Sequence, residues 1–229
     1  MNLERFKILN GTQLKLFAIL CMLIDHIGYM FFPGVLWLRA IGRLSMPIFA
    51  FFLSEAFIHT SNRLQFVLRL GLFALISELP YDYAFYGRVN FGNQNVMLTY
   101  FIAALALYFF EYIAGDWKEH FDVLRFISGF AAVGIMAYIS YLLKTDYNYK
   151  AVLVIFIFYV LKDFAQWIRV LPGVALLVAL KHNSVYKYVG LGAVPLLFYN
   201  GKKGIGLKWF FYIFYPAHLL VLYLIKRCI

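Results

Sequence analysis

The chain has 229 residues, of which 64% are hydrophobic, 21% aromatic and 14% charged, with a formal net charge of +10. Soluble domains are about 45–50% apolar, so this composition excludes an ordinary soluble domain and predicts an integral membrane protein. The Lys and Arg residues flank apolar runs, where lipid phosphates rather than nucleic acid are the expected partners. Because apolar runs fill nearly the whole chain, we expect one membrane domain, residues 1–229.

The apolar runs predict an all-α, polytopic helix bundle with about nine transmembrane helices, and hydropathy is compatible with about eight to ten. The first predicted helix covers residues 14–32. The second covers residues 37–59 and contains Pro47, which should kink the helix because proline lacks the backbone N–H. We expect the third helix to end at Pro80, and the fourth to cover about residues 96–113.

The second half of the chain is predicted to hold further spans. Before them, residues 115–125 form the most polar stretch and are expected to be a loop or an interfacial helix. Two of the later apolar runs are short for a full span, so we expect them to be tilted, broken or re-entrant. The later runs lie near residues 124–143, 149–161, 166–180, 185–199 and 207–225.

The basic residues give a weak orientation signal. The N-terminal segment is short and polar, with Arg5 and Lys7, and we expect it on the cytoplasmic side. Lys and Arg are nearly balanced between alternate loops, so the positive-inside rule adds little. With an odd number of spans, the basic residues on the N-terminal side include Arg5, Lys7, Arg63, Lys202, Lys203 and Lys208.

Three polar residues interrupt the first predicted helix. A charge near the middle of a membrane helix costs at least about 2.5 kcal/mol, so Asp25 and His26 should face protein or a water-filled cavity. Lys15 lies at the start of the helix, where its long side chain can reach the interface. Eleven residues separate Lys15 from His26, which at about 100° per residue places both on one stripe about 16 Å apart.

Polar residues concentrate in the first three predicted helices, whereas the later helices are mostly apolar and aromatic. His218, in the last predicted helix, is the main exception. This asymmetry predicts a polar site built by the first three helices and closed by the last. The alternative is that the charges pair with one another and only fix helix packing, for example Asp25 with Arg43. The polar set is Asp25, His26, Arg39, Arg43, Glu55, His59, Arg69, Glu78 and Asp82.

Several catalytic motifs are absent from the sequence. There is no HExxH motif, no Cys/His cluster, no P-loop and no GxSxG elbow. The two cysteines, Cys21 and Cys228, give no disulfide framework or metal site. We therefore expect no metal, and we regard the membrane-embedded His26 as the leading functional candidate.

Five segments, in this order, resemble the TraX family. They are LKLFAILCMLIDHIG, LRAIGRLSMPIFAFFLSEAF, RLGLFALISELPYDYAF, NVMLTY and, near the end of the chain, KWFFYIFYPAHLLVLYLI. The resemblance covers about the first 110 residues closely and about the last 20. More remotely, the chain is similar to multi-span acyltransferases that carry a basic residue ten residues before a membrane histidine; Lys15 lies eleven residues before His26, one residue further than in that pattern.

TraX is the conjugation protein that acetylates the N-terminal amine of F-pilin. The resemblance thus implies a membrane acetyltransferase that uses acetyl-CoA from the cytoplasm. The implied acceptor is an amine, such as a peptide N-terminus, or a hydroxyl, on a peptide or a small molecule. The implied location is the cytoplasmic membrane of a bacterium, in contact with lipids and with no nucleic-acid partner.

The resemblance also implies roles for particular residues. Imidazole suits a general base because its pKa of about 6.5 leaves it neutral at physiological pH, and Arg39 or Arg43 would stabilise an oxyanion. The expected catalytic group is His26, Asp25, Arg43 and Glu55. The cations expected to bind CoA are Lys15, Arg39, Arg63, Arg69 and Lys208. The acceptor is expected to contact Glu78, Asp82, Asn95, Tyr215 and His218.

Two other function classes remain open at this point. A transporter or flippase would use the same charges as a proton or substrate relay. Transporters commonly show duplicated halves with paired broken helices, and no such symmetry is visible in the sequence. A non-catalytic membrane assembly factor is the other class. Turnover of acetyl-CoA by the purified protein separates acyl transfer from both.

Overall fold

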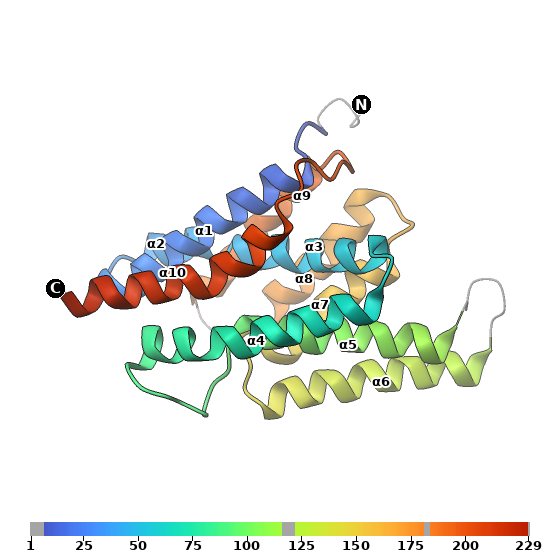
Figure 1. Ribbon diagram of the computed structural model, residues 1–229. Coiled ribbons are helices and arrows are strands. Elements are labelled where there is room, and N and C mark those ends of the chain that lie inside the picture. Colours follow the sequence, from blue (N-terminus) through green and yellow to red (C-terminus); the bar gives the residue numbers. More distant parts are fainter. Residues whose placement is uncertain (1–6, 116–121, 181–183, 229) are drawn as a thin grey trace.

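The computed structural model describes residues 7–115, 122–180 and 184–228. The described residues form a bundle of helices and no named strand, which confirms the predicted all-α membrane fold. Part of the predicted polar segment, residues 116–121, and the basic residue Arg5 lie outside this description. Figure 1 shows the helices packed into one bundle, with the first and last of them (blue and red) next to each other.

Six segments are long and apolar enough to cross a membrane. Three shorter apolar segments lie between the fifth and sixth of these, so the described residues hold nine apolar segments. About nine transmembrane helices were predicted, and six of the nine segments have the length of one. The long segments are α1 (Gly11–Phe31), α2 with α3 (Leu36–Gly42 and Ser45–His59), α4 (Arg63–Tyr86), α5 (Val96–Ala114), α6 (Val123–Leu142) and α10 (Lys208–Cys228). The shorter ones are α7 (Asn148–Val160), α8 (Gln166–Ala179) and the 3₁₀ helix η2 (Ser184–Gly192) with α9 (Ala193–Leu197).

The two prolines of the early helices behave differently. Pro47 lies in the first turn of α3, where it cannot donate to the carbonyl of Arg43, and the predicted second helix is broken between α2 and α3 at that point. The expected end of the third helix at Pro80 is wrong. α4 continues through Pro80 to Tyr86, since one missing hydrogen bond is tolerated inside a long packed helix, and it ends where Gly87 takes a left-handed conformation (φ 68°).

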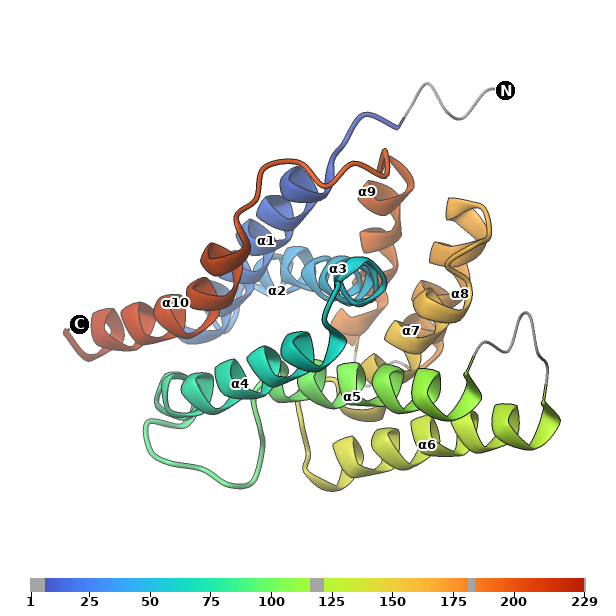
Figure 2. The ribbon, with the colours of Figure 1, turned by 45° about the vertical axis from the view of Figure 1, so that its right-hand side comes forward.

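α3 occupies the middle of the bundle. Figure 2 shows it nearly end-on, with α1 and α10 on one side, α4, α5 and α6 below, and α7, α8 and α9 on the other side. Ile48, Ala50 and Phe51 on this helix are completely buried. The span that contains α3 has the largest buried share among the long segments, so α3 is the core helix around which the others pack.

The start of α1 is tied to the segment that precedes α10. The N–H of Gly11 donates to the carbonyl of Lys202 (2.8 Å), and the hydroxyl of Thr12 donates to the carbonyl of Ile205 (2.7 Å). Gly204 has φ 77° and lies so close to Asn10 that a Cβ would approach its Oδ1 to 2.5 Å. These bonds hold the first and last spans together at one end of the bundle (Figure 1).

At the opposite end, the loop before α5 is joined to the loop after α6. The N–H of Asp146 donates to the carbonyl of Gln94 (3.0 Å), and the hydroxyl of Thr99 donates to the carbonyl of Asp146 (2.6 Å). The hydroxyls of Ser140 and Thr145 are 2.7 Å apart. These bonds fix the short 143–147 segment against α5, and this placement brings Asp146 into the site described next.

Candidate functional site

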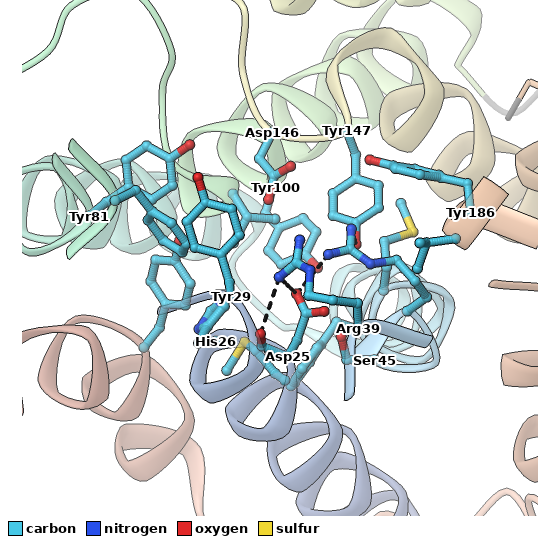
Figure 3. Close-up of a pocket in the computed structure, with 18 of the residues that line it drawn as sticks. Asp25, His26, Tyr29, Arg39, Ser45, Tyr81, Tyr100, Asp146, Tyr147 and Tyr186 are labelled. Carbon is cyan, nitrogen blue, oxygen red and sulfur yellow. Dashed lines mark hydrogen bonds and ion pairs between the residues drawn. The ribbon is translucent and has the colours of Figure 1, made fainter. Parts of the chain in front are cut away.

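A polar cavity of about 330 Å³ lies beside the C-terminal half of α1 (Figure 3). Its walls come from α1 to α5, η2, α10 and the 143–147 segment. The charged and imidazole side chains that line it are Asp25, His26, Arg39, Arg43 and Asp146. The tyrosines that line it are Tyr29, Tyr81, Tyr86, Tyr100, Tyr147, Tyr186 and Tyr215.

Asp25 holds two arginines in this cavity. Its Oδ2 lies 2.9 Å from Nη1 of Arg39 and 2.7 Å from Nη2 of Arg43, and Nη1 of Arg39 also donates to the Asp25 carbonyl (3.1 Å). Asp25 is only 7% exposed. The ion pairing expected between Asp25 and an arginine is therefore present, and it involves both candidates. Buried ion pairs of this kind need complementary partners, since a lone buried charge costs several kcal/mol.

A glycine makes this ion cluster possible. Gly42, at the end of α2, packs directly on Asp25: a Cβ at this position would come within 2.1 Å of the Asp25 Cβ. Only a residue without a side chain allows α2 to approach α1 this closely. The close approach sets the distance at which the side chains of Arg39 and Arg43 meet the carboxylate.

Tyrosine rings surround the two guanidinium groups. The Arg39 guanidinium lies 4.9 Å from the centre of the Tyr29 ring, and Nη1 of Arg43 donates to the Tyr147 hydroxyl (3.0 Å). The Arg43 guanidinium also lies 5.4 Å from the Tyr186 ring centre. The contacts with the Tyr29 and Tyr186 rings are cation–π interactions, which orient each arginine without neutralising its charge.

Asp146 was not predicted from the sequence. It follows the apolar run of α6 within a polar turn, and such a pattern is typical of an ordinary loop. In the structure the residue is half-buried and lines the cavity. Burial raises the pKa of its carboxyl to about 6, although the nearby positive charge of Arg43 opposes the rise.

His26 meets a second histidine from the last helix. Nδ1 of His26 lies 2.7 Å from Nε2 of His218, and the two ring planes differ by 7°. Nδ1 of His218 lies 2.8 Å from the Phe214 carbonyl, and the Phe85 ring stands edge-on to His26 at 5.3 Å. His218 is 7% exposed and lies behind His26 rather than in the cavity wall.

Glu55, predicted for the catalytic group, belongs to a different ionic cluster. Its Oε1 lies 2.6 Å from Nη1 of Arg169, and its Oε2 accepts from the Tyr199 hydroxyl (3.3 Å). Arg169 also donates to the carbonyl of Phe158 (2.7 Å), so α8 is attached to both α3 and α7. Glu55 is not among the cavity-lining residues.

Three residues predicted to contact the acceptor attach a loop to α4 instead of lining the cavity. The side-chain amide of Asn95 donates to Glu78 and to the carbonyl of Ala74, and its Oδ1 caps the start of α5. Asp82 accepts from the N–H of Asn90 (2.9 Å). Tyr215, from the same predicted group, is 5% exposed and does line the cavity.

The remaining predicted cations lie toward the start of α1 and outside the cavity lining. Nζ of Lys15 lies 4.6 Å from the Phe211 ring centre, and Nε of Arg63 lies 2.7 Å from Oε2 of Glu111. Lys208 is exposed at the start of α10, where its Nζ lies 5.3 Å from the Trp209 ring centre. Arg69 contacts Tyr212, and its Nε has no partner among the described residues.

The structure thus brings together some of the site residues that were predicted from the sequence. Asp25, His26, Arg39, Arg43 and Tyr215 line one cavity, and His218 joins them through His26. The roles assigned to these residues and to the more distant ones stay predictions. In the part of the chain that the structure describes, no group of three or more His, Cys, Asp or Glu side chains is placed to hold a metal ion.

The fold and the site define an integral membrane protein of the helix-bundle class, with a charged cavity lined by its helices. The chain belongs to the TraX protein family, whose sequence pattern matches residues 10–226. The resemblance noted from the sequence motifs is therefore confirmed.

Two relatives illustrate the family. The chain is 30% identical to a protein of Dichelobacter nodosus named as a probable fimbrial assembly protein FimC of serogroup H1, over 93% of this chain and 94% of that protein. It is 22% identical to an uncharacterised protein of Rickettsia prowazekii, strain Madrid E, over 82% of this chain and 68% of that protein. No solved structure matches the chain.

Proposed function

We propose that this protein is a membrane acetyltransferase that moves an acetyl group from acetyl-CoA to an amine or hydroxyl acceptor, with His26 as general base. The observation that carries the proposal is the position of the His26 imidazole, in a polar cavity inside a membrane span and beside two arginines held by Asp25. An ionisable residue at such depth is a functional candidate by default, and the family's association with pilin acetylation supports the choice of reaction.

The reaction requires little from the protein beyond positioning and proton transfer. Acetyl-CoA supplies an activated thioester. The acceptor N or O forms a bond to the carbonyl carbon and the C–S bond breaks. The lone pair of His26 takes the proton that the acceptor loses, and the same proton then goes to the departing sulfur, so no oxidant or additional reactant is needed. Arg39 and Arg43 provide the positive charge that stabilises the oxyanion.

The end of the bundle opposite the cavity is suited to the CoA phosphates. Lys15 is half-buried there, and Lys202, Lys203 and Lys208 are exposed nearby. Lys15 and His26 share one helix at a separation of about 16 Å. This is a length that the extended pantetheine arm of CoA spans, so phosphates held near Lys15 are compatible with an acetyl group delivered to His26.

The same proposal places the start of α1 on the cytoplasmic side of a bacterial membrane, because acetyl-CoA is made in the cytoplasm. The acceptor then enters the cavity from the opposite half of the bundle. One relative is named as a probable fimbrial assembly protein, which favours a peptide N-terminus, such as that of a pilus subunit, over a small molecule.

The test uses purified protein in nanodiscs with radiolabelled acetyl-CoA and a panel of short peptides, amines and alcohols. We expect wild-type protein to transfer label to one acceptor class. We expect His26→Gln to fold and bind acetyl-CoA but to transfer at least about 10²-fold more slowly. His59→Gln, which alters an exposed histidine outside the cavity, is the matched control. Substrate movement across the membrane without consumption of acetyl-CoA would replace the proposal by a transport function.

A further inference from the structure

Two histidines that are 192 positions apart in the sequence share one hydrogen bond. The nitrogens are 2.7 Å apart, the ring planes differ by 7° and the ring centres are 5.0 Å apart. Two rings stacked face to face would not bring these nitrogens into bonding contact at that centre separation. The rings of His26 and His218 therefore lie edge to edge in nearly one plane, joined by an N–H···N bond.

The Phe214 carbonyl decides which nitrogen of His218 carries hydrogen. A carbonyl oxygen only accepts, so Nδ1 of His218, 2.8 Å away, must donate to it. A neutral imidazole carries one N–H, which leaves a lone pair on Nε2 of His218. This lone pair accepts from Nδ1–H of His26. His26 is consequently in the Nδ1–H tautomer, and its Nε2 carries a free lone pair.

The two rings have different surroundings. His26 lines the cavity and is half-buried, whereas His218 is 7% exposed and absent from the cavity lining. No hydrogen bond among the described residues occupies Nε2 of His26. One histidine is thus available to reactants, and the other stands behind it, fixed to the backbone of α10.

We propose that His218 is a positioning residue that holds His26 in the Nδ1–H tautomer, so that Nε2 of His26 is the proton acceptor. The catalytic part of this inference rests on the proposed acetyl transfer, while the tautomer does not. When Nε2 of His26 takes the acceptor's proton, the Nδ1–H···Nε2 bond to His218 becomes charge-assisted and stronger. The proton leaves again from Nε2 of His26 to the departing sulfur.

The same geometry limits the histidine pair to one added proton. If both rings were protonated, Nδ1–H of His26 and Nε2–H of His218 would point at each other across 2.7 Å. The Phe214 carbonyl cannot take up a proton at the far end of the chain. The pair therefore takes up one added proton while α1 and α10 remain packed together, and its titration belongs to the pair as a unit.

The kinetic test compares two substitutions of His218. His218→Phe keeps a flat ring but removes the acceptor, whereas His218→Gln places an amide oxygen near the position of Nε2. We expect His218→Phe to lower kcat at least about tenfold with little change in KM for acetyl-CoA, and His218→Gln to recover part of the loss. Equal activity of wild type and His218→Phe, with the His59→Gln control also unchanged, would overturn the positioning role.

A spectroscopic test does not depend on activity or on the variants folding. Wild-type protein with ¹⁵N-labelled histidine is placed in nanodiscs, and the ring nitrogens of His26 and His218 are assigned by NMR with single Gln substitutions of the other three histidines, His59, His120 and His182, as references. We expect both rings as Nδ1–H tautomers near neutral pH. Finding Nε2–H on His26 would refute the inference even if acetyl transfer is observed. The expected tautomers in a protein without acetyl transfer would refute only the proposed function.

Discussion

Oδ2 of Asp25 lies 2.7 Å from Nη2 of Arg43 and is shared with Arg39, so one carboxylate contacts both the buried Arg43 and the half-buried Arg39. The arrangement joins α1 to α2 at the edge of the cavity. The two arginines carry more charge than the Asp25 carboxylate. Each arginine also contacts a tyrosine: Arg43 donates to the Tyr147 hydroxyl, and Arg39 lies over the Tyr29 ring. The cluster therefore contributes to stability and to the field in the cavity at the same time.

Asp25→Asn should destabilise the fold as well as lower activity. The substitution removes the carboxylate that both Arg39 and Arg43 contact directly, and breaking a buried pair costs about 3–5 kcal/mol. Thermal unfolding in detergent measures the first effect and acetyl transfer the second. A variant as stable as wild type but inactive would mean that Asp25 takes part in the reaction itself.

Gly42→Ala should disturb the same cluster by steric pressure. The new Cβ would lie 2.1 Å from the Asp25 Cβ and 2.3 Å from Oδ1, so α2 must move away from α1. Overpacking of this kind costs about 1–3 kcal/mol, and we expect a lower Tm together with reduced activity. Gly134→Ala is the matched control, because a Cβ there meets nothing within 4 Å and alanine favours the helix.

Lys15→Ala should raise KM for acetyl-CoA more than it lowers kcat if Lys15 binds a CoA phosphate. Its contact with the Phe211 ring is lost in the same variant, so Lys15→Arg, which keeps the charge, should retain most of the affinity. Lys226→Ala removes a cation at the end of α10 and should leave KM unchanged. An unaltered KM in Lys15→Ala would assign Lys15 to lipid phosphate.

The pH dependence of acetyl transfer should show a limb that rises with pH. Nε2 of His26 can accept a proton only while the histidine pair is unprotonated, so the rate should fall as the pH is lowered. A profile of kcat/KM for wild type gives the apparent pKa of the pair. The residual acetyl transfer by His26→Gln should not rise with pH in this way. If the pH profile of kcat/KM is unchanged in that variant, His26 is not the general base, and His218 becomes the next candidate.

Asp146 makes a separate prediction about stability. Its folded-state pKa of about 6 lies above the ordinary aspartate value of 3.8, so the folded state binds this proton more tightly than the unfolded state. The stabilisation of the fold by the proton on Asp146 is fully present below about pH 4, and it is lost as the pH rises through 6. The Asp146→Asn side chain cannot ionise. At pH 7 to 8 the variant should therefore unfold at a higher temperature than wild type, and its free energy of unfolding should be larger by at most about 3 kcal/mol.

The comparison across pH provides the check on Asp146. The difference in Tm between Asp146→Asn and wild type should shrink toward pH 4, where both side chains are neutral. Asp122→Asn is the control, because it replaces an exposed cap of α6 with another good cap. A constant difference between pH 4 and pH 8 would show that burial does not disfavour the Asp146 carboxylate.

The sequence by itself determined the features that depend on neighbours along the chain. Apolar run lengths predicted a helical membrane bundle, and the 3.6-residue period placed Lys15 and His26 on one stripe of α1. The local cost of unpaired charge predicted a partner for Asp25 among nearby arginines. The same local reasoning failed at Pro80, because packing along α4 offsets one missing backbone hydrogen bond.

Only the tertiary structure decided which distant residues meet. Asp146 reaches the cavity because the 143–147 segment is hydrogen-bonded to Gln94 and Thr99, and nothing near Asp146 in the sequence specifies those partners. His218 reaches His26 because α10 packs beside α1, across 192 positions. Contacts of such separation depend on the whole arrangement of helices in the bundle, since hydropathy places each helix in the membrane but does not choose its neighbours.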